Sequence, residues 1–294
     1  MQFAAIDIGT NAARLLIGEV AHEGKSSFVK KISYTRIPLR LGESVFSTGE
    51  ISAQKQEEFI KTIKAFSLIA DIFNVTELKA CATSAMREAN NGSEVQQKIK
   101  DETGVTIDII SGQEEAELIF STFFLMNIDR TLPFVVVDVG GGSTEVSVFE
   151  NGERVAAKSF QLGTLRLLQD KTDESIWDEI HDWLIKHLDM SIVHEIYATG
   201  GNINKVHKLL GAGYMEPISL EEISSLRDEL NSLTINERIT NYQLKPDRAD
   251  VIVPALDIYL YILNELDCSE VVVPKIGLAD GMIYTMDLKH RGGL

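Results

Sequence analysis

Residues Phe3 to Gly18 read FAAIDIGTNAARLLIG, and residues Phe134 to Phe149 read FVVVDVGGGSTEVSVF. The two stretches align without a gap and place Asp7 opposite Asp138, a constant offset of 131 residues (138 − 7). Each copy is an apolar, largely β-branched run, an Asp-x-Gly turn and a second apolar run, which is typical of a β-hairpin. A repeat with so long a period predicts two related domains rather than a solenoid.

The segments after each hairpin alternate between helical and strand patterns. For example, residues 52–73 place Phe59, Ile63 and Phe66 on one helical face. Such alternation after a hairpin predicts an α/β fold with a mixed sheet in each domain. We expect further helices at 84–102, from 113, at 174–188, 220–233 and 247–266, and from 278, and strands at 78–83, 105–110, 195–198 and 271–273. Pro254 should kink the helix 247–266.

The stretch NIDRTLP at 127–133 interrupts this pattern and marks the domain boundary. We therefore expect residues 1–127 to form domain I and residues 128–294 to form domain II. The last helix is a candidate to pack back on domain I. A chain of 294 residues is long enough to give each domain its own core.

Composition restricts the class of protein. The chain is 44% hydrophobic and 24% charged, as in globular proteins, and has no apolar run near the ~18 residues that span a bilayer. The first residues lead directly into a strand, so no secretory signal is expected. Cys81 and Cys268 fit no metal or redox spacing and should be small buried residues. Together these features predict a cytoplasmic protein.

The net charge of −16 argues against a general nucleic-acid surface, which needs a basic patch. It does not exclude an anionic substrate, because a few arginines and backbone amides can bind phosphate locally. The second hairpin turn offers such a place. Glycines let backbone N–H groups approach an anion closely, and hydroxyls add donors. The candidate phosphate-binding residues of this turn are Gly140, Gly141, Gly142, Ser143 and Thr144.

The aspartate that ends the first strand of each hairpin, Asp7 or Asp138, is well placed to hold Mg²⁺ or another divalent cation, directly or through water. The alternative is that aspartate and glycine only make tight turns. Two copies of the same Asp-x-Gly motif favour phosphate binding in a cleft between the two domains.

Several further motifs occur in order along nearly the whole chain: AIDIGTNAARLLI (5–17), RLGE (40–43), ATSAMREANN (82–91), ISGQEEA (110–116), DVGGGSTE (138–145), LGTLRL (162–167), ATGGN (198–202) and RADVI (248–252). Together they resemble one family, the exopolyphosphatase / guanosine pentaphosphate phosphohydrolase (Ppx/GppA) phosphatases of the actin, sugar kinase and Hsp70 superfamily. The resemblance implies two actin-like (ribonuclease H-like) ATPase-fold domains with an interdomain cleft, in the short form without extra helical domains.

The resemblance also implies roles for individual carboxylates. Glu115, the second glutamate of SGQEEA, corresponds to the family's catalytic base. Glu145, which closes the motif that begins with Asp138, should help to position the attacking water or the metal ion. A carboxylate can orient and deprotonate the water that attacks a phosphoanhydride. The competing interpretation is that Glu114 and Glu115 form an ordinary acidic first turn of a helix.

Basic and polar side chains complete the expected site. Arg87 matches the family's phosphate-contacting arginine, and Arg14 occupies the repeat position of Glu145. Thr10 and Asn11 should contact phosphate in the first turn, while Arg40 and Arg166 are undecided between site and surface. The chain departs from the family at two positions: Ala12 replaces a serine, and Asn202 replaces a common threonine.

The sequence thus predicts a metal-dependent hydrolase that releases the terminal phosphate from inorganic polyphosphate, guanosine pentaphosphate (pppGpp) or both. Two alternatives remain open at this point: a non-catalytic polyphosphate or alarmone sensor, and a small-molecule kinase of the same superfamily. No nucleic-acid or membrane partner is expected. The short form is compatible with a homodimer.

Overall fold

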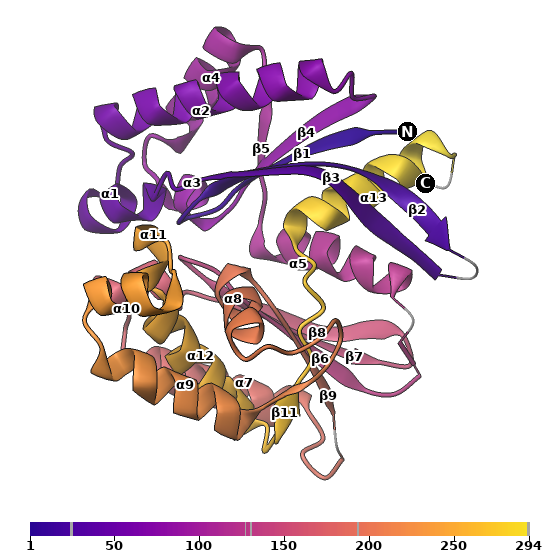
Figure 1. Ribbon diagram of the computed structural model, residues 1–294, viewed down its shortest axis with the longest axis vertical. Helices are drawn as coiled ribbons and strands as arrows, with labels where there is room; N and C mark the ends of the chain where they lie inside the picture. Colours follow the sequence, from indigo (N-terminus) through magenta and orange to yellow (C-terminus); the bar gives the residue numbers. More distant parts are fainter. Residues whose placement is uncertain (24–25, 127, 130, 193, 293–294) are drawn as a thin grey trace. The chain divides into compact units, whose positions relative to one another are not determined.

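The computed structural model describes residues 1–23, 26–126, 128–129, 131–192 and 194–292. They form two compact units (Figure 1): unit 1 is Met1–Ile128 with Ile276–Leu294, and unit 2 is Asp129–Lys275. Asn127, the last residue of the domain I expected from sequence, lies outside the described residues. The last helix, α13 (Leu278–His290), belongs to unit 1.

Unit 1 is built on a mixed five-stranded sheet in the order β3-β2-β1-β4-β5. Its first hairpin pairs β1 with β2 antiparallel, and β1 also pairs with β4 in parallel. The edge strand β3 extends the hairpin and was not expected from sequence. The strands are β1 (Phe3–Ile8), β2 (Ala13–Glu23), β3 (Ser26–Ile37), β4 (Glu77–Ala82) and β5 (Ile107–Ile109).

Helices cover both faces of this sheet (Figure 1). On one face, Ala4, Ile6 and Ile8 of β1 pack into a core with the apolar side of α2. Asp7 points to the opposite face because side chains alternate along a strand; α13 crosses that face against β1 and β2, with α5 beside it. The helices are α1 (Leu41–Thr48), α2 (Ala53–Ile72), α3 (Ser84–Glu88), α4 (Gly92–Thr103) and α5 (Gly112–Ser121), followed by the 3₁₀ turn η1 (Thr122–Leu125).

Unit 2 repeats the same plan. Its sheet has the order β8-β7-β6-β9, and Val272 adds a parallel bridge to Tyr197 beside β9, in the place that β5 takes in unit 1. The register of the two hairpins is the same, since Asp7 pairs with Arg14 and Asp138 pairs with Glu145. The strands are β6 (Phe134–Val139), β7 (Thr144–Glu150), β8 (Glu153–Phe160), β9 (Glu195–Thr199), β10 (Ile218–Ser219) and β11 (Glu270–Val271).

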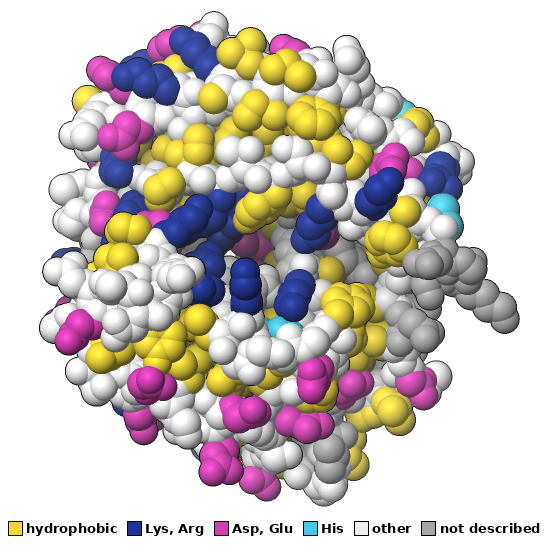
Figure 2. Space-filling view, in the orientation of Figure 1, with side chains coloured by type: hydrophobic (Ala, Val, Ile, Leu, Met, Phe, Trp, Pro, Cys, Tyr) yellow, Lys and Arg dark blue, Asp and Glu magenta, His cyan; other side chains and the backbone are white. Residues whose placement is uncertain are grey.

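The helices of unit 2 enclose a second core, in which alternate residues of β6, Val135, Val137 and Val139, lie in one cluster with apolar residues of α7 and α12. On the face drawn in Figure 2, acidic side chains are scattered over the part of unit 2 where α9 lies, in keeping with the negative net charge. The helices are α6 (Thr164–Leu168), α7 (Ser175–His187), α8 (Gly201–Leu209), α9 (Leu220–Ser232), α10 (Ile235–Tyr242), α11 (Pro246–Ala249) and α12 (Ile252–Glu265).

Two helix predictions were wrong in the same way. The single helix expected at 247–266 is two helices, α11 and α12, and Pro254 lies in the first turn of α12 instead of kinking a long helix. Proline is tolerated there because the first amides of a helix have no partner within the helix. The helix expected at 84–102 is likewise split into α3 and α4. Within the described residues, no helix combines the length and apolarity that crossing a membrane requires.

Helix α13 approaches α5 closely at Gly281, where a Cβ atom would lie 1.9 Å from the Leu118 carbonyl oxygen. We expect Gly281→Ala to destabilise the protein by about 1–3 kcal/mol, the usual cost of overpacking. Helix propensity alone would change stability by up to ~1 kcal/mol in the opposite direction. Chemical denaturation measures the change in the free energy of unfolding. A variant more stable than the wild type would contradict the close approach of the two helices.

Candidate active site

The turn of each hairpin is closed by the same backbone hydrogen bond. Gly9 N donates to Ala12 O at 3.1 Å, and Gly140 N donates to Ser143 O at 2.9 Å. The repeat seen in the sequence therefore extends to the geometry of the turns. We call residues 9–12 turn 1 and residues 140–143 turn 2.

The carbonyl groups of turn 2 are bound from behind by the segment that leads into α6. Gly140 O accepts from Thr164 N at 3.0 Å, and Gly141 O accepts from Leu165 N at 2.8 Å. The Arg166 guanidinium contributes as well, because its Nε donates to Gly142 O at 3.0 Å. Arg166 is buried and holds the turn, so its position supports a structural role.

The segment before α6 can lie this close to turn 2 because residue 163 is glycine. A Cβ atom at Gly163 would lie 2.5 Å from Gly141 C and from Gly142 N and C. Within the described part of the chain, the amides of Gly141 and Gly142 donate to no acceptor. A turn whose carbonyl groups already accept hydrogen bonds and whose amides can still donate has the arrangement of an anion-binding nest.

The hydroxyls of Ser143 and Thr144 differ in whether they can donate to a phosphate. The Thr144 hydroxyl donates to Leu162 O at 2.6 Å and is fully buried, so its single proton is committed to the fold. This assigns Thr144 a structural bond where the sequence suggested a phosphate contact. Ser143 is the remaining hydroxyl of the predicted set.

Turn 1 is supported in the same manner. Thr10 O accepts from Gly42 N at 3.1 Å, and Asn11 O accepts from Arg40 N at 3.0 Å. The Arg40 side chain donates from Nε to Glu43 at 2.6 Å. The Ala12 methyl group is buried. Thus Arg40 supports turn 1 through its backbone, as the residues before α6 support turn 2.

The two strand-end aspartates have different partners, although they occupy equivalent positions. Asp7 forms an ion pair with its cross-strand neighbour Arg14, with Nη1 and Oδ2 2.7 Å apart. Asp138 instead faces a second acid, Glu145, and carboxylate oxygens of the two lie within 4.8 Å. Glu145 is buried and also accepts a 2.6 Å hydrogen bond from the Ser159 hydroxyl.

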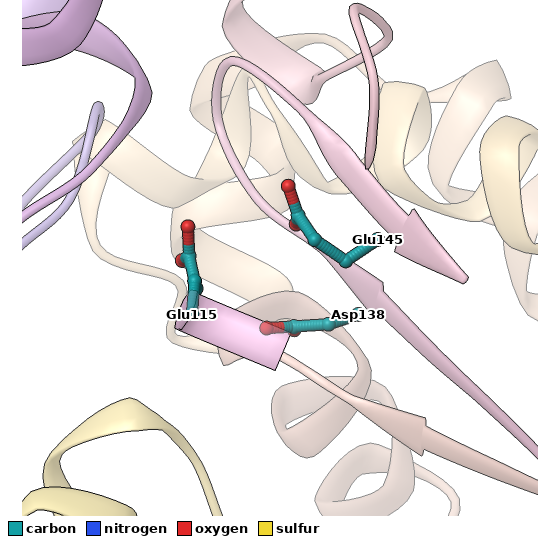
Figure 3. A group of neighbouring side chains, drawn as sticks. All are labelled: Glu115, Asp138 and Glu145. Atoms are coloured by element: carbon teal, nitrogen blue, oxygen red, sulfur yellow. The ribbon is translucent and has the colours of Figure 1, made fainter. Parts of the chain in front are cut away.

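The different partners of the two aspartates indicate which of the predicted metal ligands fit a metal ion. Two neighbouring carboxylates repel each other and are stabilised by a divalent cation, for which carboxylate oxygen is a preferred ligand. Asp138 and Glu145 therefore fit a metal ion, whereas the charge of Asp7 is already balanced by Arg14. Figure 3 draws Asp138 and Glu145 on neighbouring strands of unit 2.

The adjacent glutamates of α5 also have different roles. Glu114 completes a capping box with Ser111: its carboxylate accepts from Ser111 N at 2.8 Å, and Glu114 N donates to the Ser111 hydroxyl at 3.1 Å. The Ser111 hydroxyl also donates to this carboxylate, at 2.8 Å, and the two bonds from Ser111 N and the Ser111 hydroxyl lower the pKa of Glu114 below its ordinary value. The ordinary explanation, an acid that stabilises the start of a helix, thus accounts for Glu114. Glu115 lies in the same first turn but takes no part in the capping box.

Within unit 1, Glu115 lies in the electrostatic neighbourhood of the strand ends. Burial, opposed by the charge of Lys79 and assisted by the charges of Asp108, Asp7 and Glu115, raises the pKa of Cys81 to about 12. Cys81 is therefore an inert buried thiol, as expected from sequence. Cys268 is only half-buried, and its Sγ donates to Glu270 O.

Arg87, the predicted phosphate ligand, links two parts of unit 1. Its Nη1 donates to Ile110 O at 2.8 Å, directly before the Ser111 cap of α5. Because a guanidinium has five N–H donors, this bond leaves others for an anion. Arg87 is thus held beside the start of the helix that carries Glu115.

The two units, each with a hairpin leading a mixed sheet, have the actin-like ATPase fold, and comparison with known proteins agrees. The model of the Ppx/GppA phosphatase family matches residues 20–290. The chain belongs to this family. The α/β fold class and the family resemblance predicted from the motifs are confirmed.

Individual relatives and one solved structure show how far the similarity extends. Exopolyphosphatase 1 of Mycobacterium bovis is 35% identical over 58% of this chain and 48% of its own length, so the match spans about half of that relative. The guanosine-5'-triphosphate,3'-diphosphate pyrophosphatase of Photobacterium profundum is 25% identical over 98% of this chain and 60% of its own. The Ppx/GppA crystal structure from Aquifex aeolicus is 26% identical, with a TM-score of 0.76 over 99% of this chain and 98% of that chain.

Proposed function

We propose that the chain is a phosphohydrolase that releases the terminal phosphate from inorganic polyphosphate, from pppGpp or from both, and that it acts in the cytoplasm. The observation that carries the proposal is the paired carboxylates Asp138 and Glu145 at the base of a glycine turn whose carbonyls are engaged from behind. Family membership and the activities for which the two relatives are named support the substrate class.

The proposed phosphate ligands are backbone amides of turn 2, the Ser143 hydroxyl and Arg87, with Thr10 and Asn11 of turn 1. Arg14 would contribute any guanidinium donors that its ion pair with Asp7 leaves available. These groups would neutralise the charge that builds on the transferred phosphoryl group.

Asp138 and Glu145 would hold Mg²⁺ or a similar divalent cation, which supplies charge neutralisation for the phosphate oxygens when bound. Glu115 would act as the general base. It would take a proton from the attacking water as the water oxygen bonds to the terminal phosphorus and the bond to the leaving oxygen breaks. The proposal requires unit 1 to bring Glu115 to a phosphate held by unit 2.

A malachite-green assay of phosphate release with Mg²⁺ tests the proposal. The substrates are polyphosphates of several lengths, pppGpp and ATP, each with an EDTA control. We expect release from polyphosphate or pppGpp that EDTA abolishes. Binding of these anions without release would instead favour the sensor, and transfer of phosphate from ATP to a small molecule would favour the kinase.

A further inference from the structure

Strands β6 and β9 of unit 2 separate at the proposed site. They run in parallel until Asp138 pairs with Thr199. Beyond this pair, β6 continues into turn 2, and β9 continues through Gly200 into α8. Val139 and Thr199 are buried here, so water cannot satisfy their backbone groups. Buried N–H and C=O groups need other partners, since leaving one unpaired is costly.

The hydroxyl of Tyr259 supplies both partners. It accepts from Val139 N at 3.2 Å and donates to Thr199 O. Tyr259 lies on α12 and is fully buried, with Leu256 and Ile262 of the same helix in the core of unit 2. One side chain, fixed by core packing, therefore bridges the two strands where their own pairing ends.

The same hydroxyl and the Asp138 carboxylate both lie against Gly200. A Cβ atom on Gly200 would be 3.1 Å from Tyr259 Oη, 3.1 Å from Asp138 Oδ1 and 2.9 Å from Val139 O. Gly200 has a φ of +120°, a conformation that residues with side chains rarely adopt, so glycine lets the backbone at this position lie against all three atoms. Burial, and next the charge of Asp138, raise the pKa of Tyr259 well above its usual value. The hydroxyl therefore keeps its proton and remains a donor to Thr199.

We propose that Tyr259 is a positioning residue, whose hydroxyl fixes the separation of β6 and β9 and thereby the placement of Asp138 and turn 2. Its contribution to the reaction rests on the proposed function. The effect would act through other groups, because the hydroxyl is occupied by two backbone partners and does not itself reach a substrate. The sequence offers no signal for it, since Tyr259 reads as one more apolar residue of a core helix.

Tyr259→Phe tests the inference because it removes only the hydroxyl, and Tyr261→Phe is a matched control. Tyr261 lies two residues further along α12, and its hydroxyl also donates to a backbone carbonyl, that of Trp177, at 2.7 Å. We expect Tyr259→Phe to lower kcat by about tenfold to a hundredfold, as a misplaced catalytic group does. We expect Tyr261→Phe to leave kcat unchanged even where it lowers the melting temperature.

Amide hydrogen exchange supplies a readout that needs neither substrate nor metal. In the wild-type chain, Val139 N–H should exchange only on global unfolding, and in Tyr259→Phe the segment 139–143 should exchange faster, whereas Tyr261→Phe should not change it. Rapid exchange of Val139 in the wild type would overturn the inference, even if Tyr259→Phe did not fold. Unchanged exchange or unchanged kcat in a folded Tyr259→Phe variant would also overturn it. A wild type that releases no phosphate would instead refute the proposed function and leave the exchange result to decide about Tyr259.

Discussion

Glu115→Gln is expected to lower the rate of phosphate release by about a hundredfold to ten-thousandfold, the usual contribution of a general base. Glutamine has nearly the same size and still accepts a hydrogen bond, but it cannot take a proton from water. Polyphosphate binding should therefore remain measurable, because the proposed phosphate ligands are other residues. The measurements are phosphate release under saturating substrate and binding by isothermal titration calorimetry with the same anion.

The neighbouring glutamate provides the control. Glu114→Gln is the same chemical change one residue earlier, and glutamine suits the last position of a capping box as glutamate does. Its turnover should stay close to that of the wild type. Wild-type turnover in Glu115→Gln would remove Glu115 from its proposed role. An equal loss in both variants would point to the helix start as a whole rather than to one base.

The sequence predicted the two hairpins well, because the local residue pattern and the repeat of that pattern both indicated them. Apolar runs ended by Asp-x-Gly predict a strand and a turn, and the constant offset requires both copies to fold alike. The strands β1 and β6 begin at Phe3 and Phe134, and the turns are closed by equivalent bonds. The edge strands β3 and β8 were not predicted, because they lie outside the aligned stretches and mix polar with apolar residues.

The contacts that hold turn 2 in place could not be predicted. They come from residues about 20 positions further along the chain, whose types do not by themselves indicate such a role. The Arg166 side chain donates to Gly142 O, and Gly163 lies against the backbone of turn 2, and only the tertiary structure creates these contacts. The sequence treated Asp7 and Asp138 alike, and only their cross-strand partners distinguish them. Arg14 pairs with Asp7, whereas Glu145 stands beside Asp138, so the same motif forms an ion pair in one unit and a candidate metal site in the other.

Gly163→Ala is expected to reduce phosphate release by about a hundredfold or more, since displacements near 1 Å can cost that much in a positioned site. The new methyl group would lie 2.5 Å from backbone atoms of Gly141 and Gly142. Backbone cannot rotate away as the end of a flexible side chain does, so turn 2 has to shift. Because turn 2 is the proposed phosphate nest, KM should rise while kcat falls. Steady-state kinetics on polyphosphate measures both.

Gly277→Ala separates this displacement from the general effect of losing a glycine at the start of a helix. Gly163 and Gly277 are both N-cap residues with extended backbone, at φ −148° and −171°. Alanine is a poorer N-cap than glycine, and this loss is common to both variants. Only the surroundings differ, because a Cβ atom on Gly277 would meet nothing within 4 Å. Near wild-type kinetics in Gly277→Ala beside a large loss in Gly163→Ala would therefore assign the loss to turn 2, whereas wild-type kinetics in Gly163→Ala would show that the turn does not bind the reacting phosphate.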